Sequence, residues 1–244
     1  MFADVSEFLY ALSVWVIPVV IAITFHEAAH GWVADKLGDD TARRMGRVTF
    51  NPIRHVDRFG TIILPAILLL FAPFVFGYAK PVPVNFARLK RPKRDMVWVA
   101  LAGPGMNIAL ALLSTGLLHL AFLLPASLVK WSALVLVASM LINVILAVFN
   151  MLPVPPLDGG RVAVGLLPRR LAVPLARLER LGIFLVIGVL LVVPMIGNSL
   201  GVDLPVFFWL VWLPASFVIE GIGFVAGIDE DLIGQLIMLL PGLG

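Results

Sequence analysis

Five long stretches of the chain are almost free of charged residues, and short basic or polar segments separate them. These stretches approach or exceed the roughly 20 apolar residues that a membrane-spanning helix needs. The pattern therefore predicts an all-α polytopic membrane protein with about five transmembrane helices. The predicted helices are Phe8–Phe25, Met96–Leu124, Trp131–Leu152, Leu181–Val193 and Leu204–Phe224.

The interval between the first two predicted helices has a different pattern. Short alternating pieces at Arg47–Phe50 and Pro81–Phe86 are typical of β-strands. Between them a further apolar run, Phe59–Tyr78, is interrupted by Pro65 and Pro73. This run either crosses the membrane or enters it and returns on the same side.

The chain shows no internal repeat and no low-complexity tract. Its longest polar stretches, about 20 residues, are too short to form an independent domain. We expect residues 1–244 to form a single membrane-embedded domain, with its core at about 8–161 and C-terminal helices at about 180–226.

Composition and charge agree with a membrane protein. Of the 244 residues, 61% are hydrophobic and 14% are charged, whereas soluble domains carry roughly 25% charged residues. Basic residues gather in short loops, which are normally retained in the cytoplasm, and no recognition motif accompanies them, so we expect the lipid bilayer and no nucleic acid as a partner. These residues include Arg43, Arg44, Arg47, Arg88, Lys90, Arg91, Lys93, Arg94, Arg169 and Arg170.

The residues that carry chemistry lie at the end of the first apolar stretch. His26, Glu27 and His30 form the pattern H-E-x-x-H. Four residues advance a helix by about 400°, so both imidazoles share one face and can bind one metal ion. Glu27 can then act as general base on a water molecule beside the metal. An ordinary polar cluster is the alternative, but burying such groups in lipid costs roughly 2–3 kcal/mol for each charge unless they are paired or coordinated.

A catalytic zinc site needs a third protein ligand and one open position. The chain has no cysteine, which leaves imidazole and carboxylate groups. His55 lies in a basic loop and His119 near the far end of its helix, so Asp158 is the better candidate. It follows three prolines that break the third helix, and Gly159 and Gly160 allow a sharp turn beside it. An aspartate that only caps a turn is the alternative.

Three sequence elements, in this order, resemble those of the site-2 protease family of intramembrane zinc metalloproteases. They are the motif His26–His30, the run Ala102–Asn107 and the element Leu157–Gly159. The resemblance implies His26, His30 and Asp158 as ligands of one Zn²⁺ per chain and Glu27 as general base. It also implies that Asn150 helps to hold the substrate or to stabilise the oxyanion, and that Asn107 is either catalytic or an interhelical hydrogen-bonding residue.

Many relatives carry a PDZ or nucleotide-sensing domain, and this chain resembles a minimal core without either. The implied function is hydrolysis of peptide bonds in or near transmembrane segments of membrane protein substrates. A substrate helix would have to unwind first, because its carbonyl groups are internally hydrogen-bonded. The edge of either predicted strand is a candidate surface for holding the opened segment. A metal or proton transporter that uses the same ionisable residues is the alternative function. We expect Glu220, the remaining charge in an apolar run, at the membrane interface, and a gating or substrate contact is the alternative.

The three motifs can meet only if the first and third predicted helices run in the same direction. The helix between them must then start on the side where the first one ends. Phe59–Tyr78 is therefore expected to be a re-entrant apolar hairpin, with short β-strands beside it on the cytoplasmic side. The N-terminus would lie outside, and the active site would open toward the cytoplasm of a cell whose plasma membrane holds the protein.

Overall fold

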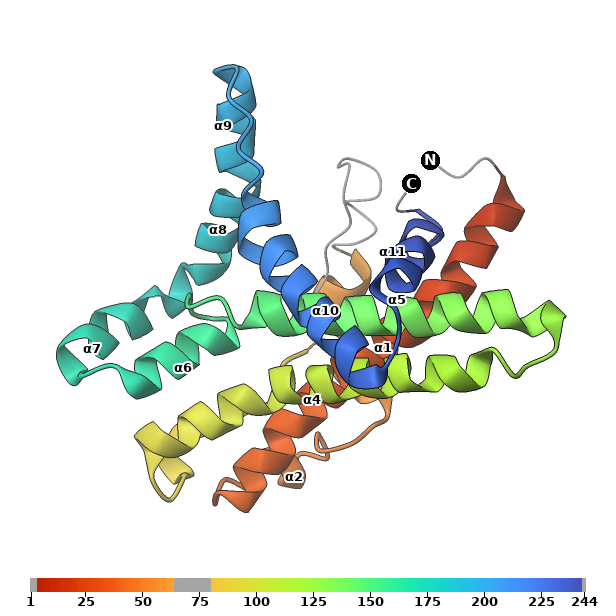
Figure 1. Ribbon diagram of the computed structural model, residues 1–244. Helices are drawn as coiled ribbons and strands as arrows, with labels where there is room; N and C mark the ends of the chain where they lie inside the picture. Colours follow the sequence, from red (N-terminus) through yellow and green to blue (C-terminus); the bar gives the residue numbers. More distant parts are fainter. Residues whose placement is uncertain (1–3, 64–79, 243–244) are drawn as a thin grey trace.

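The computed structural model describes residues 4–63 and 80–242, and every regular element among them is a helix (Figure 1). Four of these helices are long and apolar enough to cross a membrane: α1 (Val5–Lys36), α4 (Pro92–Ala121), α5 (Ala126–Asn150), and the continuous helix formed by η6 (Phe208–Trp212) and α10 (Leu213–Ala226). The all-helical class is thus confirmed, and the count of five spans is not.

The fourth predicted helix, Leu181–Val193, differs from the other four. In this region three short pieces follow one another: α8 (Gly182–Ile187), the π-helical η5 (Gly188–Val192) and α9 (Val193–Ser199). Its apolar helical run, Phe184–Ser199, is shorter than the four candidate spans. Glycine and proline within the run weaken a regular helix, because glycine adds backbone entropy and proline removes a hydrogen-bond donor.

The site is held by three crossing helices. Asp4 caps α1 by accepting a hydrogen bond from the backbone N–H of Glu7 at 2.8 Å. α4 begins with Pro92, a favourable first residue for a helix. Figure 1 shows that α4 and α5 run in opposite directions, while α1 crosses them in broadly the direction of α5. The shared direction of α1 and α5 is the one that the three motifs require.

The remaining elements extend from this frame. α5 ends at Asn150, before the prolines, and Asp158 begins a new helix, α6. α10 ends at Gly227, whose positive φ of 67° suits glycine at a helix end. α1, α4, α5, α10 and α11 share one apolar core. The other described elements are α2 (Thr41–Arg44), η1 (Pro52–His55), η2 (Arg58–Ile63), η3 (Phe86–Arg88), α6 (Asp158–Leu166), α7 (Arg169–Arg177), η4 (Leu178–Arg180) and α11 (Glu230–Met238).

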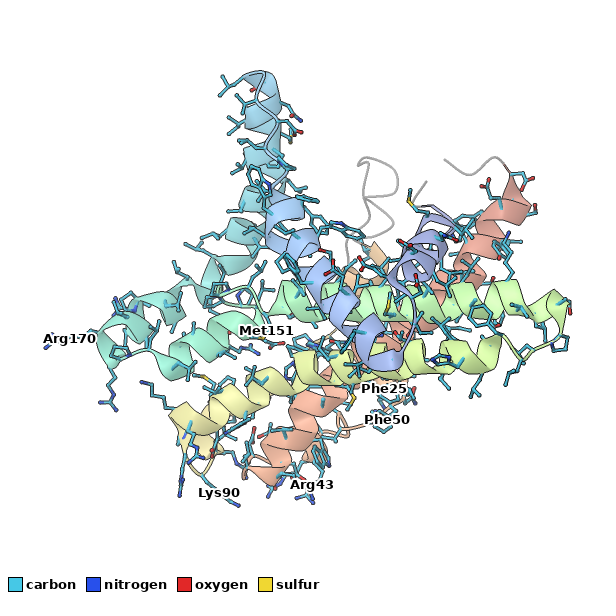
Figure 2. All side chains as sticks on the ribbon, viewed as in Figure 1. Phe25, Arg43, Phe50, Lys90, Met151 and Arg170 are labelled. Carbon is cyan, nitrogen blue, oxygen red and sulfur yellow. The ribbon has the colours of Figure 1, made fainter. Side chains whose placement is uncertain are left out.

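The predicted strands at Arg47–Phe50 and Pro81–Phe86 do not form. Residues 81–85 have no regular secondary structure, and no strand is present in the described part of the chain. Pro81 and Pro83 have no backbone N–H to donate, and the N–H of Val82 donates to the Glu27 carboxylate instead. The segment Arg47–Phe50 makes a side-chain contact instead: Phe50 stacks on Phe25 with ring centroids 4.2 Å apart (Figure 2). The backbone donors that a ladder needs are therefore missing or already used.

Most of the predicted re-entrant run, Phe59–Tyr78, lies outside the described residues. The residues that flank it are close to each other. The backbone N–H of Lys80 donates to the carbonyl of His55 at 2.9 Å, and the Arg47 guanidinium donates to the Lys80 carbonyl at 2.6 Å. His55 and Lys80, which lie on either side of this run in the sequence, are therefore in direct contact.

Candidate metal centre

One face of α1 presents two imidazoles to the interior of the protein. His26 and His30 are each 7% exposed, and their Nε2 atoms lie 3.0 Å apart. The spacing of four residues brings both rings to the same side of the helix. Gly103 of α4 and Asp158 at the start of α6 lie against the two rings, which are buried.

The first residue of α6 completes the cluster. Asp158 is 5% exposed, and its Oδ2 atom lies 3.2 Å from the Nε2 atoms of both His26 and His30. The turn before it is tight: a Cβ added at Gly159 would lie 2.1 Å from the Met151 carbonyl oxygen. Glycine therefore allows α6 to start against the end of α5, and this position directs the carboxylate toward α1.

The three atoms form a nearly equilateral triangle. Tetrahedral zinc with bonds of about 2.0 Å separates its ligand atoms by about 3.3 Å, which is close to the distances found here. The Oδ2 atom of Asp158 is buried and has no hydrogen-bond partner. Of all histidine, aspartate and glutamate groups in the described residues, this is the set that could hold a metal ion. The donor set and its geometry fit zinc.

The protonation of the two rings is set by their other nitrogens. His26 Nδ1 lies 2.5 Å from the Oδ1 atom of Asn107, and His30 Nδ1 lies 2.7 Å from the Val99 carbonyl oxygen. Both partners only accept hydrogen bonds, so each Nδ1 carries the proton and each neutral ring has a free Nε2 lone pair.

Glycine is required where α4 crosses the two rings. A Cβ added at Gly103 would lie 2.4 Å from His30 Nε2 and 2.6 Å from His26 Nε2. By contrast, a Cβ added at Gly105 would meet no atom within 4 Å. Only one of the two glycines that flank Pro104 is thus a steric requirement of the metal centre.

Glu27 lies beside the cluster and is held by a different segment. Its Oε2 atom accepts a hydrogen bond from the backbone N–H of Val82 at 2.7 Å. The Val82 side chain packs so closely on α1 that a Cβ added at Gly31 would lie 3.0 Å from its Cγ1 atom. Val82 therefore lies against the part of α1 that carries Glu27.

The other residues considered from sequence lie elsewhere or play another part. Asn150 donates to the Leu146 carbonyl of its own helix at 2.9 Å. The Nε2 atoms of His55 and His119 face the carbonyl oxygens of Thr49 and Ala226, each at 2.9 Å. Asn107 makes interhelical hydrogen bonds, as one of its two sequence interpretations requires.

Sequence reasoning missed three groups at the site: the Val82 amide, the close approach of Gly103, and Asn143, which is fully buried against Asn107. A signal for one of them was available. Asn143 is a polar residue in the middle of an apolar helix, and such residues generally have a partner.

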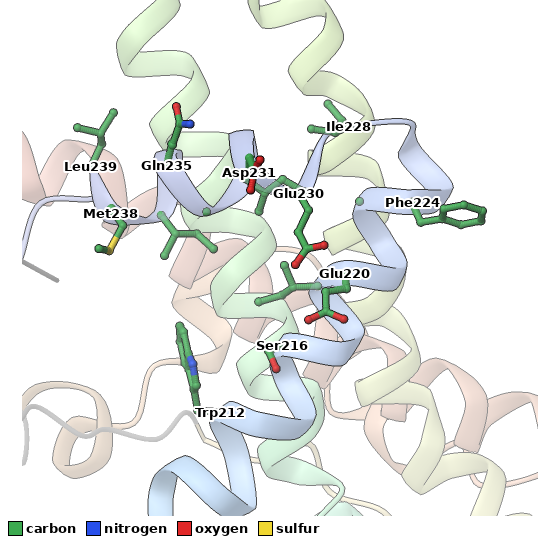
Figure 3. A pocket seen from close by; sticks show the side chains of 15 residues that line it. Trp212, Ser216, Glu220, Phe224, Ile228, Glu230, Asp231, Gln235, Met238 and Leu239 are labelled. Atoms are coloured by element: carbon green, nitrogen blue, oxygen red, sulfur yellow. The ribbon is translucent and has the colours of Figure 1, made fainter.

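Glu220 lines a separate cavity of about 890 Å³ between α10 and α11 (Figure 3). Glu230 and Asp231 are also in its lining, together with Trp212 and Ser216. The Glu220 side chain is exposed. This cavity is therefore distinct from the buried metal cluster.

Two imidazoles and a carboxylate around one point, with a glutamate beside them in a membrane-helix fold, define the site of a metal-dependent hydrolase. Comparison with known proteins specifies the class. The model of peptidase family M50 matches residues 14–130 and 115–194, and the chain belongs to this family, that of the site-2 proteases. It is a zinc metalloprotease of the membrane.

Two relatives illustrate the similarity. The chain is 41% identical over 184 residues to the proposed zinc metalloprotease YwhC of Bacillus subtilis, an alignment that covers 74% of this chain and 80% of the relative. It is 29% identical over 196 residues to the proposed zinc metalloprotease Rip2 of Mycolicibacterium smegmatis, which covers 80% and 71% of the two chains. No solved structure matches.

Proposed function

We propose that this protein is an intramembrane zinc endopeptidase that hydrolyses peptide bonds in or near transmembrane segments of membrane protein substrates. In this proposal His26, His30 and Asp158 bind the zinc ion, and Glu27 is the catalytic base. The observation that carries it is the buried triangle of two Nε2 atoms and one carboxylate oxygen, with edges of 3.0–3.2 Å. Residues 1–244 would act as one membrane-embedded domain.

When bound, the zinc ion would supply Lewis-acid polarisation of the scissile carbonyl and acidify the attacking water. Glu27 would accept the proton of that water and deliver it to the leaving nitrogen. The ring hydrogen bonds of His26 and His30 would keep their Nε2 lone pairs on the metal throughout the reaction. Asn150, whose amide now donates to its own helix, would turn to hold the substrate backbone or the oxyanion.

The decisive experiment separates metal binding from turnover. We expect Glu27→Gln to retain zinc but to lower the cleavage of a single-span test substrate by about 100- to 10,000-fold, because an amide cannot accept the proton. Zinc content is measured by metal analysis of protein purified in detergent, and cleavage is followed with and without a zinc chelator. Near wild-type cleavage by this variant would refute the mechanism. A transporter, in contrast, would not need a base at this position.

We further propose that the active site opens toward the cytoplasm from the plasma membrane, with the N-terminus outside. Arg43, Lys90 and Arg170 lie toward one end of the helices in Figure 2, and basic ends normally stay in the cytoplasm. The chain contains no cysteine, so single cysteines can be placed at Arg54 and Lys90. Both should react with a membrane-impermeant thiol reagent from the cytoplasmic side. Labelling from opposite sides would contradict this orientation.

A further inference from the structure

The middle of α5 carries a fully buried amide, Asn143. It lies among apolar residues of the common core, and its own neighbours in sequence include the buried Leu141 and Val144. Burying an amide in such apolar surroundings without hydrogen-bond partners would cost on the order of several kcal/mol. Both ends of this side chain are paired.

The partners of Asn143 differ in kind. Its Nδ2 donates to the Ser139 carbonyl of the same helix at 2.8 Å, and its Oδ1 accepts from Asn107 Nδ2 on α4 at 2.7 Å. The Ser139 carbonyl can only accept, so it fixes which end of the Asn143 amide faces it. The oxygen must therefore face Asn107.

The orientation of the Asn107 amide links Asn143 to the candidate metal centre. Asn107 Nδ2 donates both to Asn143 and to the Ala22 carbonyl, at 3.2 Å. With its nitrogen held in this way, Asn107 has to present its oxygen to His26 Nδ1, at 2.5 Å. That contact keeps the proton on Nδ1 and leaves the Nε2 lone pair toward Asp158.

We propose that Asn143 is a positioning residue for the metal ligand His26, acting through Asn107. Its effect is to fix the orientation of the Asn107 amide. If Asn107 were free to turn, it could present its N–H₂ group to the imidazole, which would then need its proton on the atom that should bind the metal. This inference rests on the proposed function, since it assumes that His26 binds zinc.

A purely structural role for Asn143, as a hydrogen bond between α4 and α5, would affect stability alone. The test therefore measures zinc affinity in detergent by competition with a chelator, together with the melting temperature. We expect Asn143→Leu to weaken zinc binding by about tenfold, within the roughly 10- to 100-fold range for residues that orient metal ligands. Asn143→Asp, which as a buried neutral acid can donate its O–H to the Ser139 carbonyl and keep an oxygen facing Asn107, should restore most of this affinity.

The double variant tests the route of the effect. If Asn143 acts only through Asn107, then adding Asn143→Leu to Asn107→Leu should weaken zinc binding no further. Additive losses would overturn the proposal. Ser114→Ala is the matched control, because it removes another α4–α5 hydrogen bond, to the Ser139 hydroxyl at 2.8 Å, and keeps the Ser139 carbonyl that accepts from Asn143. It should leave zinc affinity unchanged.

The outcomes also separate this inference from the proposed function. Unchanged zinc affinity in Asn143→Leu would refute the relay, whereas the Glu27→Gln result would still decide the protease mechanism. Wild-type protein that binds zinc with the expected dependence on Asn143 but cleaves no test substrate would support the relay and count against the protease. Wild-type protein that binds no zinc would overturn both.

Discussion

Two carboxylates of this largely apolar chain lie in contrasting surroundings. Asp158 is 5% exposed and is surrounded by ring nitrogens at 3.2 Å. Glu220 is exposed and lines an open cavity of about 890 Å³ in which Figure 3 also shows Glu230 and Asp231. In the sequence, both residues are charged groups in or near apolar segments. Of the two, only Asp158 lies beside groups with which it could bind a metal ion.

The difference shows what burial demands of a charged group. A carboxylate removed from water needs opposite charge or a metal ion, because the desolvation penalty is several kcal/mol. In the proposed function, a zinc ion held between Asp158 and the two neutral imidazoles would meet this need. The far sides of the two rings are hydrogen-bonded to Asn107 and Val99. Glu220 is exposed and therefore needs no comparable set of partners. A dense set of partners, rather than the charge itself, thus distinguishes the metal centre.

The largest effect is expected at the buried carboxylate. Asp158→Ala should weaken zinc binding by more than about 100-fold, beyond the usual range for residues that only orient ligands, and should abolish cleavage. Metal analysis and the chelator competition measure this loss. Glu220→Gln is the matched control and should retain full zinc occupancy and the wild-type melting temperature. Equal zinc occupancy in the two variants would mean that the third ligand is another residue.

A smaller effect should follow from filling the space above the rings. Gly103→Ala places a methyl group against both Nε2 atoms, so zinc affinity should fall and the free energy of unfolding should drop by about 1–3 kcal/mol. Gly105→Ala adds the same group where no atom is within 4 Å, and alanine favours a helix by up to about 1 kcal/mol. If both variants bound zinc like the wild type, α4 could not cross the metal centre as described.

The smallest effect concerns Glu27, the proposed base, rather than the metal. Val82→Pro removes the N–H that holds Glu27, a hydrogen bond to a charged group worth about 1.5–3 kcal/mol. We expect kcat to fall about 10- to 100-fold with zinc affinity unchanged. Val82→Ala keeps the N–H and should retain a higher kcat than Val82→Pro. A faster Val82→Pro enzyme would instead indicate that residues 81–85 obstruct the site.

Much of the fold could be read from local pattern. Long apolar stretches predicted four helices that the structure contains, and the prolines after Asn150 predicted where α5 ends. The errors fell where the local signal was weak or where tertiary contacts prevailed. Alternation at Pro81–Phe86 suggested a strand, but prolines and the Glu27 carboxylate removed its backbone donors. The run at Leu181–Val193 is apolar and helical, but a π-helical segment interrupts its α-helix and the apolar helix is shorter than the four candidate spans.

By itself, the sequence determined which chemical groups this protein has for a metal site and that they lie in apolar surroundings. A spacing of four residues is enough to bring two histidines to one helix face, because helix geometry is local. The sequence did not determine which groups would meet them across 69 or more positions of the chain. The tertiary structure decided that Asn107 would face His26, that Gly103 would pass over both rings, and that Asn143 would lie behind Asn107. The physical reason is that these contacts depend on how α1, α4 and α5 cross, and crossing geometry is set by the packing of all three helices together.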